Sequence, residues 1–75
     1  MTELRIPAAG DAVTEVQLVE WVVANGVTVS AGQHIYSIES DKSVLEVEAP
    51  VDGVLRIAVE AGGILPVGEL VGAID

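Results

Sequence analysis

Apolar and polar residues alternate in short stretches along most of this chain, and a period of two is typical of half-buried β-strands. We predict strands at residues 2–7, 16–23, 27–29, 33–39, 44–49, 64–65 and 69–74, and a further one that contains Leu55. The alternation predicts these inward-pointing side chains: Val19, Trp21 and Val23; Leu55, Ile57 and Val59; Leu45, Val47 and Ala49. Ile35 and Ile38 lie three residues apart, which breaks the alternation and predicts a β-bulge in that strand.

The chain also partly repeats itself at an offset of 36 residues. The matched pairs are Val23 with Val59, Gly26 with Gly62, Gly32 with Gly68, Ile38 with Ile74 and, less closely, Val19 with Leu55. Residues 4–7 match 47–50 at an offset of 43, so the first half carries extra residues, which we assign to a loop at 8–14. Gly26 and Gly62 are expected in turns with positive φ. Two copies in one small domain predict pseudo-twofold symmetry, because neither half could bury its apolar face alone.

The predicted fold is therefore all-β. We expect two four-stranded antiparallel sheets packed as a flattened barrel, a barrel-sandwich hybrid, in a single domain over residues 1–75. Hydrophobic residues make up 51% of the chain and valine dominates them, which suits a pleated sheet. There is no cysteine, so aliphatic packing has to hold the fold without disulfides.

Twelve acidic residues against three basic ones give a formal net charge of −9. Such a chain repels phosphate backbones and anionic lipid surfaces, so we expect neither a nucleic-acid nor a membrane partner. Long-range attraction would favour a partner with a basic docking surface. The N-terminal residues lack the basic start and apolar stretch of a signal peptide, and we expect a cytoplasmic protein.

Lys42 is the only lysine of the chain. It lies in the stretch Glu39-Ser40-Asp41-Lys42-Ser43, between the strands predicted at 33–39 and 44–49. The sequence therefore predicts one primary amine at the tip of a hairpin. Small serines lie on either side of the amine, so another enzyme could reach it and acylate it.

Other chemistry finds little support in the sequence. The acids Glu39, Asp41, Glu46 and Glu48 are interpreted as a solvated face and not as a metal or general-acid cluster, because spacing by two puts strand carboxylates on one exposed face and no histidine accompanies them. His34 is interpreted as a strand residue, and Trp21 and Tyr36 as core or rim packing. No phosphate-binding glycine loop or nucleophile with its base is present. We predict no catalytic residue and no metal site.

The whole chain resembles the lipoyl-attachment domain of the acyltransferase (E2) components of 2-oxo acid dehydrogenase complexes. The matching positions are Pro7, Gly10, Asp11, Glu15, Trp21, Gly26, Gly32, Ile38 to Lys42, Ala49, Pro50, Gly53, Val54, Gly62, Gly68 and Leu70. Three positions depart from the usual pattern. Ser43 stands where alanine is commonest, Val16 where glycine is frequent, and Val27 where aspartate often follows the glycine.

The resemblance implies a non-catalytic carrier in which lipoate is joined to Lys42 by an amide, with Glu39, Ser40, Asp41 and Ser43 as the flanking residues that are recognised. Lipoate ligase or a lipoyl transferase would attach the cofactor. The arm would then visit a thiamine-diphosphate 2-oxo acid decarboxylase, the acyltransferase core and dihydrolipoamide dehydrogenase. We expect a monomer when the domain is isolated. A mitochondrial matrix location would apply if the domain comes from a larger eukaryotic precursor.

The resemblance also suggests a role for the loop at 8–14, with Gly10, Asp11 and Glu15 docking the decarboxylase. We expect this loop near the Lys42 hairpin, on the reasoning that strand 2–7 runs beside the strands of that hairpin. An ordinary solvated connector is the alternative.

Three alternatives share the predicted architecture. A biotinyl carrier also uses an exposed lysine, but that family usually flanks it with methionines, and here the sole methionine is Met1. An unmodified adaptor would not need Lys42. The glycine-cleavage carrier is usually longer. The sequence leaves open which 2-oxo acid complex is served, and whether the domain is free-standing or part of a dihydrolipoamide acyltransferase.

Overall fold

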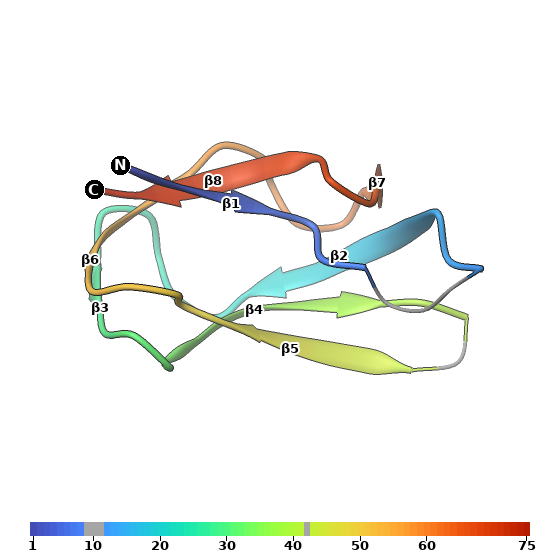
Figure 1. Cartoon of the computed structure of the whole chain (residues 1–75), viewed down its shortest axis with the longest axis horizontal. Coiled ribbons are helices and arrows are strands. Elements are labelled where there is room, and N and C mark those ends of the chain that lie inside the picture. Colours follow the sequence, from blue (N-terminus) through green and yellow to red (C-terminus); the bar gives the residue numbers. More distant parts are fainter. Residues whose placement is uncertain (9–11, 42) are drawn as a thin grey trace.

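The computed structural model describes residues 1–8, 12–41 and 43–75, and there the chain forms two four-stranded antiparallel sheets (Figure 1). The strands are β1 (Thr2–Arg5), β2 (Glu15–Trp21), β3 (Thr28–Val29), β4 (His34–Glu39), β5 (Val44–Glu48), β6 (Gly53–Ile57), β7 (Ile64–Pro66) and β8 (Leu70–Ile74). The order β1-β8-β6-β3 makes up what we term the terminal sheet, and β5-β4-β2-β7 the hairpin sheet. The predicted all-β class and its two sheets are confirmed.

The two halves of the chain interleave. Each sheet takes its two central strands from one half and its two edge strands from the other. Replacing β1, β8, β6 and β3 by their repeat counterparts β5, β4, β2 and β7 turns one strand order into the other. The pseudo-twofold arrangement predicted from the repeat is therefore present in the topology, and it accounts for why one half alone could not close a core.

A bulge in β2 corrects one part of the prediction. The register between β2 and β4 shifts between Leu18 and Glu20, so Val19 is an extra residue of that strand. Leu18 is fully buried, whereas Val19 is 40% exposed, and its expected inward orientation is wrong. An inserted residue reverses which side chains face the core. Past the bulge, Trp21 and Val23 do pack against the core, as expected.

Two hydrogen bonds show which residues of β2 and β6 correspond to each other in the repeat. Gly26 N–H donates to the Leu55 carbonyl at 2.7 Å, and Gly62 N–H donates to the Leu18 carbonyl at 2.7 Å. Leu55 therefore corresponds to Leu18, and not to Val19 as the sequence offset suggested. Gly26 and Gly62 have φ values of 87° and 106°, which confirms the predicted turns of positive φ.

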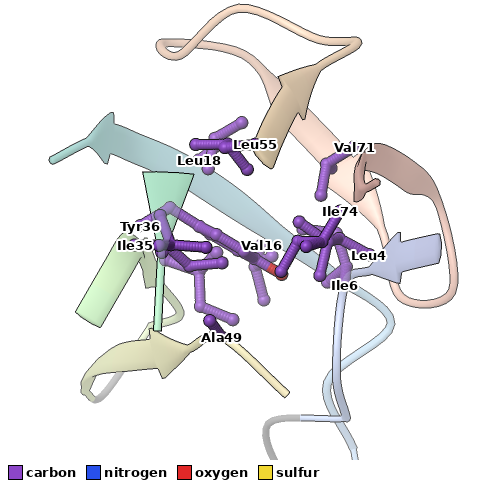
Figure 2. Close-up of a cluster of buried hydrophobic side chains, with 12 residues drawn as sticks. Leu4, Ile6, Val16, Leu18, Ile35, Tyr36, Ala49, Leu55, Val71 and Ile74 are labelled. Atoms are coloured by element: carbon purple, nitrogen blue, oxygen red, sulfur yellow. The ribbon is translucent and has the colours of Figure 1, made fainter. Parts of the chain in front are cut away.

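Side chains from both sheets fill a single core (Figure 2). Leu18, Ile35 and Leu55 are fully buried in it. The ring of Tyr36 lies 4.7 Å from that of Trp21, centroid to centroid, and Trp21 Nε1 donates to the Val59 carbonyl at 2.9 Å. The two aromatic residues are packing residues, as predicted.

The bulge expected in the strand around Ile35 and Ile38 is confirmed. The register between β4 and β5 shifts between His34 and Tyr36, and the four residues from Ile35 to Ile38 are all buried. β4 is thus an interior strand anchored over most of its length. The molecule measures 33 × 20 × 18 Å, and the chain termini lie at the opposite end of the long axis from the C-terminal end of β4 (Figure 1).

Candidate functional site

The β4–β5 hairpin ends in a tight connection. Glu39 and Val44 form the last pair of the ladder, and beyond them Ser40 N–H donates to the Ser43 carbonyl at 2.9 Å. The Ser40 hydroxyl lies 3.4 Å from the same carbonyl. Only Asp41 and Lys42 separate these two serines in the sequence. The antiparallel strands thus close immediately around the dipeptide that sequence reasoning singled out.

Lys42 itself lies outside the described residues, and its placement at the tip stays a prediction. Its neighbours are described: Asp41 and Ser43 are exposed, and Ser40 is half-buried. Because β4 is held in the interior of the hairpin sheet, the base of the tip has a defined position on the fold.

An open hollow of about 520 Å³ lies beside the tip, on the hairpin sheet. Its lining comes from four strands and the connection: Glu15, Val16, Gln17, Glu39, Ser40, Asp41, Ser43, Val44 and Ile64. The sequence pattern identified the residues on β4 and β5 as neighbours of the lysine. It gave no sign that Gln17 and Ile64 would join them, because that depends on β7 pairing with β2, which connects parts of the chain far apart in sequence.

The described part of the early loop lies beside the same tip. Ala12, Val13 and Thr14 line a smaller hollow together with Glu15 and Asp41. The reason we gave for this proximity is wrong, however, because β1 pairs with β8 in the terminal sheet and not with the hairpin strands. The link runs instead through β2, which begins at Glu15 and pairs directly with β4. Gly10 and Asp11, two of the three expected docking residues, lie outside the described residues.

His34 has contacts that suit a strand residue. Its Nε2 atom is 3.0 Å from the Tyr36 carbonyl oxygen and 3.1 Å from the Ser37 hydroxyl, and its Nδ1 atom is 3.5 Å from a Glu46 carboxylate oxygen. Within residues 1–8, 12–41 and 43–75, no three His, Cys, Asp or Glu side chains are grouped so as to hold a metal ion. The same residues contain no helix with the length and apolar character to cross a membrane.

Residues 2–74 match the sequence model of the biotin/lipoyl family, described as "Biotin-requiring enzyme". The chain is 39% identical over 70 residues to the dihydrolipoyllysine-residue acetyltransferase component 5 of the chloroplastic pyruvate dehydrogenase complex of Arabidopsis thaliana. It is 34% identical over 74 residues to the corresponding pyruvate dehydrogenase component of Staphylococcus aureus. These alignments cover 92% and 97% of this chain but only 15% and 17% of the two relatives.

Among solved structures, the fold matches the lipoyl domain of the 2-oxoglutarate dehydrogenase complex from Azotobacter vinelandii. The TM-score is 0.83 at 29% sequence identity, and the match covers 100% of this chain and 96% of that domain. The similarity of the fold therefore extends over the whole chain.

Proposed function

This chain belongs to the biotin/lipoyl domain family, and on that premise we propose that it is a lipoyl carrier whose Lys42 holds lipoate in amide linkage. The observation that carries the proposal is the closure of the β4–β5 hairpin by Ser40 and Ser43 around Asp41 and Lys42. The likeness to acyltransferase components and to a solved lipoyl domain favours lipoate over biotin.

The residues around the dipeptide suit enzymatic modification. Asp41 and Ser43 are exposed, and neither serine is large enough to screen a neighbouring amine from a ligase. A lysine side chain has an ordinary pKa near 10.4, so the ligase has to accept a proton from the amine before an amide can form. Asp41 would orient the side chain, and Glu39, Ser40 and Ser43 would complete the surface that the ligase recognises.

The attached lipoate would supply a disulfide that accepts an acyl group and two electrons at one active site and delivers them at others. The protein's own contribution is placement. The buried β4 strand holds the base of the tip, while the long lysyl stem leaves the attached group free to enter separate active sites. Amide formation also removes one positive charge from an already acidic domain. The domain itself performs no catalysis.

The partners follow from this role. Lipoate ligase or a lipoyl transferase would attach the group, a thiamine-diphosphate 2-oxo acid decarboxylase would load it, an acyltransferase core would unload it and dihydrolipoamide dehydrogenase would reoxidise it. This chain spans about a sixth of the length of the curated relatives that it matches. Whether the decarboxylase acts on pyruvate, on 2-oxoglutarate or on branched-chain 2-oxo acids is decided by assay with each.

Intact mass tests the modification. The unmodified domain is incubated with lipoate ligase, lipoate and ATP, and separately with biotin ligase, biotin and ATP. We expect a mass increase of one lipoyl group in the first reaction and none in the second. The Lys42→Arg variant keeps the charge and is expected to fold normally and accept neither group. Biotin incorporation would assign the chain to the biotinyl carriers, and modification of Lys42→Arg would show that the site is elsewhere.

We further propose that the early loop docks the decarboxylase, with Gly10, Asp11 and Glu15 as the contributing residues. The supporting observation is that residues 12–14 and Glu15 share a hollow with Asp41. Exchanging residues 8–14 for the loop of a carrier from a different 2-oxo acid complex should lower loading by the matching decarboxylase and leave lipoylation intact. Unchanged loading would show that the loop is only a connector.

A further inference from the structure

Two unusually exposed aliphatic side chains lie near the hairpin tip. Apart from the terminal Met1, Ile64 and Val44 are the most exposed large apolar residues in the described part of the chain, at 66% and 59%. A single exposed aliphatic residue is ordinary on a protein surface. These two are notable because they line the same hollow, at its two sides.

The sheet register explains how they come together. Val44 pairs with Glu39, Glu39 with Gln17, and Gln17 with Ile64, so the four residues form one continuous row across the hairpin sheet. Directly paired residues of antiparallel strands project from the same face. In the neighbouring row Leu18 and Ile38 are buried, and only Leu45 on the edge strand β5 is partly exposed, at 40%, so the row that we term the tip row faces outward.

The internal repeat offers a comparison within the same molecule. With the β2 bulge taken into account, the positions that correspond to the tip row in the terminal sheet are Met1, Asp75, Val54 and Thr28. Ile64 thus corresponds to a threonine. Glu39 corresponds to Asp75, whose carboxylate is engaged by Arg56 at 3.0 Å. The terminal sheet thus has a polar residue at the position of Ile64 and a charge-paired one at the position of Glu39, so the fold alone does not require the isoleucine on β7.

The two sheets also differ in their charged side chains. Both arginines of the chain, Arg5 and Arg56, lie on strands of the terminal sheet and pair with Glu3 and Asp75. Around the tip row the described charged groups are all acidic: Glu15, Glu39 and Asp41. None of them forms an ion pair with another described residue. The hollow therefore presents apolar side chains at two sides of an acidic centre.

We propose that the tip row is a contact surface for the decarboxylase that loads the carrier, with Ile64 as its apolar anchor. The proposal rests on the lipoyl-carrier function and extends the contact area beyond the tip and the early loop to β7. The chemistry of the row defines the matching surface of the partner: an apolar depression for Ile64 next to lysine or arginine side chains that face Glu39. Interfaces of this kind take affinity from a few buried apolar anchors and take rate and specificity from complementary charge.

The test uses the lipoylated domain and compares Ile64→Ser with the matched control Val27→Ser. Val27 is also an exposed aliphatic residue, at 44%, but it precedes β3 at the edge of the terminal sheet. Each variant is lipoylated, and the rate of lipoylation by the ligase checks that the tip is intact. Reductive acylation is then measured with the pyruvate, 2-oxoglutarate and branched-chain 2-oxo acid decarboxylases, using whichever loads the wild-type domain.

We expect Ile64→Ser to lower kcat/KM for loading about tenfold, chiefly through a higher KM for the domain, while Val27→Ser loads like the wild type. Glu39→Gln should weaken the dependence of loading on salt, because it removes one acid from the contact. If Ile64→Ser is lipoylated and loaded as well as the wild type, the tip row is not a contact surface and the proposal fails, although the carrier function stands. If the wild type accepts no lipoate, the carrier function and this proposal both fail.

Discussion

The sole tyrosine should make the stability of the domain fall measurably at alkaline pH. Tyr36 is 1% exposed, and its hydroxyl lies 3.3 Å from the Arg5 carbonyl oxygen, to which it donates. Burial raises the pKa of Tyr36 from its ordinary value of 10.0 to about 12, because the phenolate would lose its hydration inside the core. The unfolded chain therefore releases this proton at a lower pH than the folded domain does.

The sign and size of the effect follow from that difference. The tyrosine contribution to stability is fully present below pH 10 and is lost as the pH rises towards 12, since only the unfolded state ionises in that interval. The loss amounts to about 1.4 kcal/mol for each pH unit, and to between 2 and 3 kcal/mol, roughly, over the whole interval. For a domain of this size, that is a large part of the total stability.

Urea unfolding at a series of pH values measures this loss of stability at alkaline pH, with Tyr36→Phe as the comparison. Because the variant lacks the hydroxyl and its hydrogen bond, its free energy of unfolding should be about 1 kcal/mol lower at neutral pH. Above pH 10 this free energy should fall less steeply than that of the wild type. All other ionisable groups are the same in both proteins, so the difference between the two curves isolates the phenol. Parallel curves for the two proteins through this range would refute the reasoning.

Three further predictions concern packing, turns and the attachment site. Leu18→Ala should destabilise the domain by about 2–5 kcal/mol, whereas Val19→Ala should cost less than about 1 kcal/mol because Val19 is the partly exposed bulge residue; equal effects in urea unfolding would contradict the assigned register. Gly72→Ala should destabilise more than Gly26→Ala: a Cβ at Gly72 would lie 2.5 Å from the Arg56 carbonyl oxygen, whereas one at Gly26 meets nothing within 4 Å and suffers only its positive φ, so calorimetric melting temperatures in the reverse order would be inconsistent with this packing. Lys42→Arg should keep the melting temperature of the unmodified domain and abolish lipoylation, with intact mass as the readout.

Much of this fold could be predicted because local pattern and repeat agree. Alternation located the strands, and the matched glycines located turns that require positive φ, as Gly26 and Gly62 have. The repeat then predicted two equivalent sheets without any knowledge of pairing. The inward orientation of Leu55 and the solvated position of Arg56 also follow from alternation alone.

What escaped prediction depended on contacts between distant parts of the chain. The bulge at Val19 leaves no local signal, because Leu18 and Val19 are both aliphatic and only the pairing with β4 decides which one is buried. The partner of β1 was misjudged for a related reason: its pattern shows that it is a strand but not which strand it joins. Ile64 was expected in a short strand, yet its exposure beside the tip follows from the register of β7 against β2.

The symmetry of the fold makes its two ends interchangeable in principle. Thr2 pairs with Ile74 just as Leu45 pairs with Ile38, so the N- and C-termini stand next to each other where the other copy of the repeat has its hairpin turn. A circularly permuted chain, joined there by a short turn and opened at another loop, would keep all eight strand positions. On the proposed carrier function, writing Asp-Lys into the new turn would create a second acceptor for the ligase at the far end of the molecule, and a carrier that bears two arms.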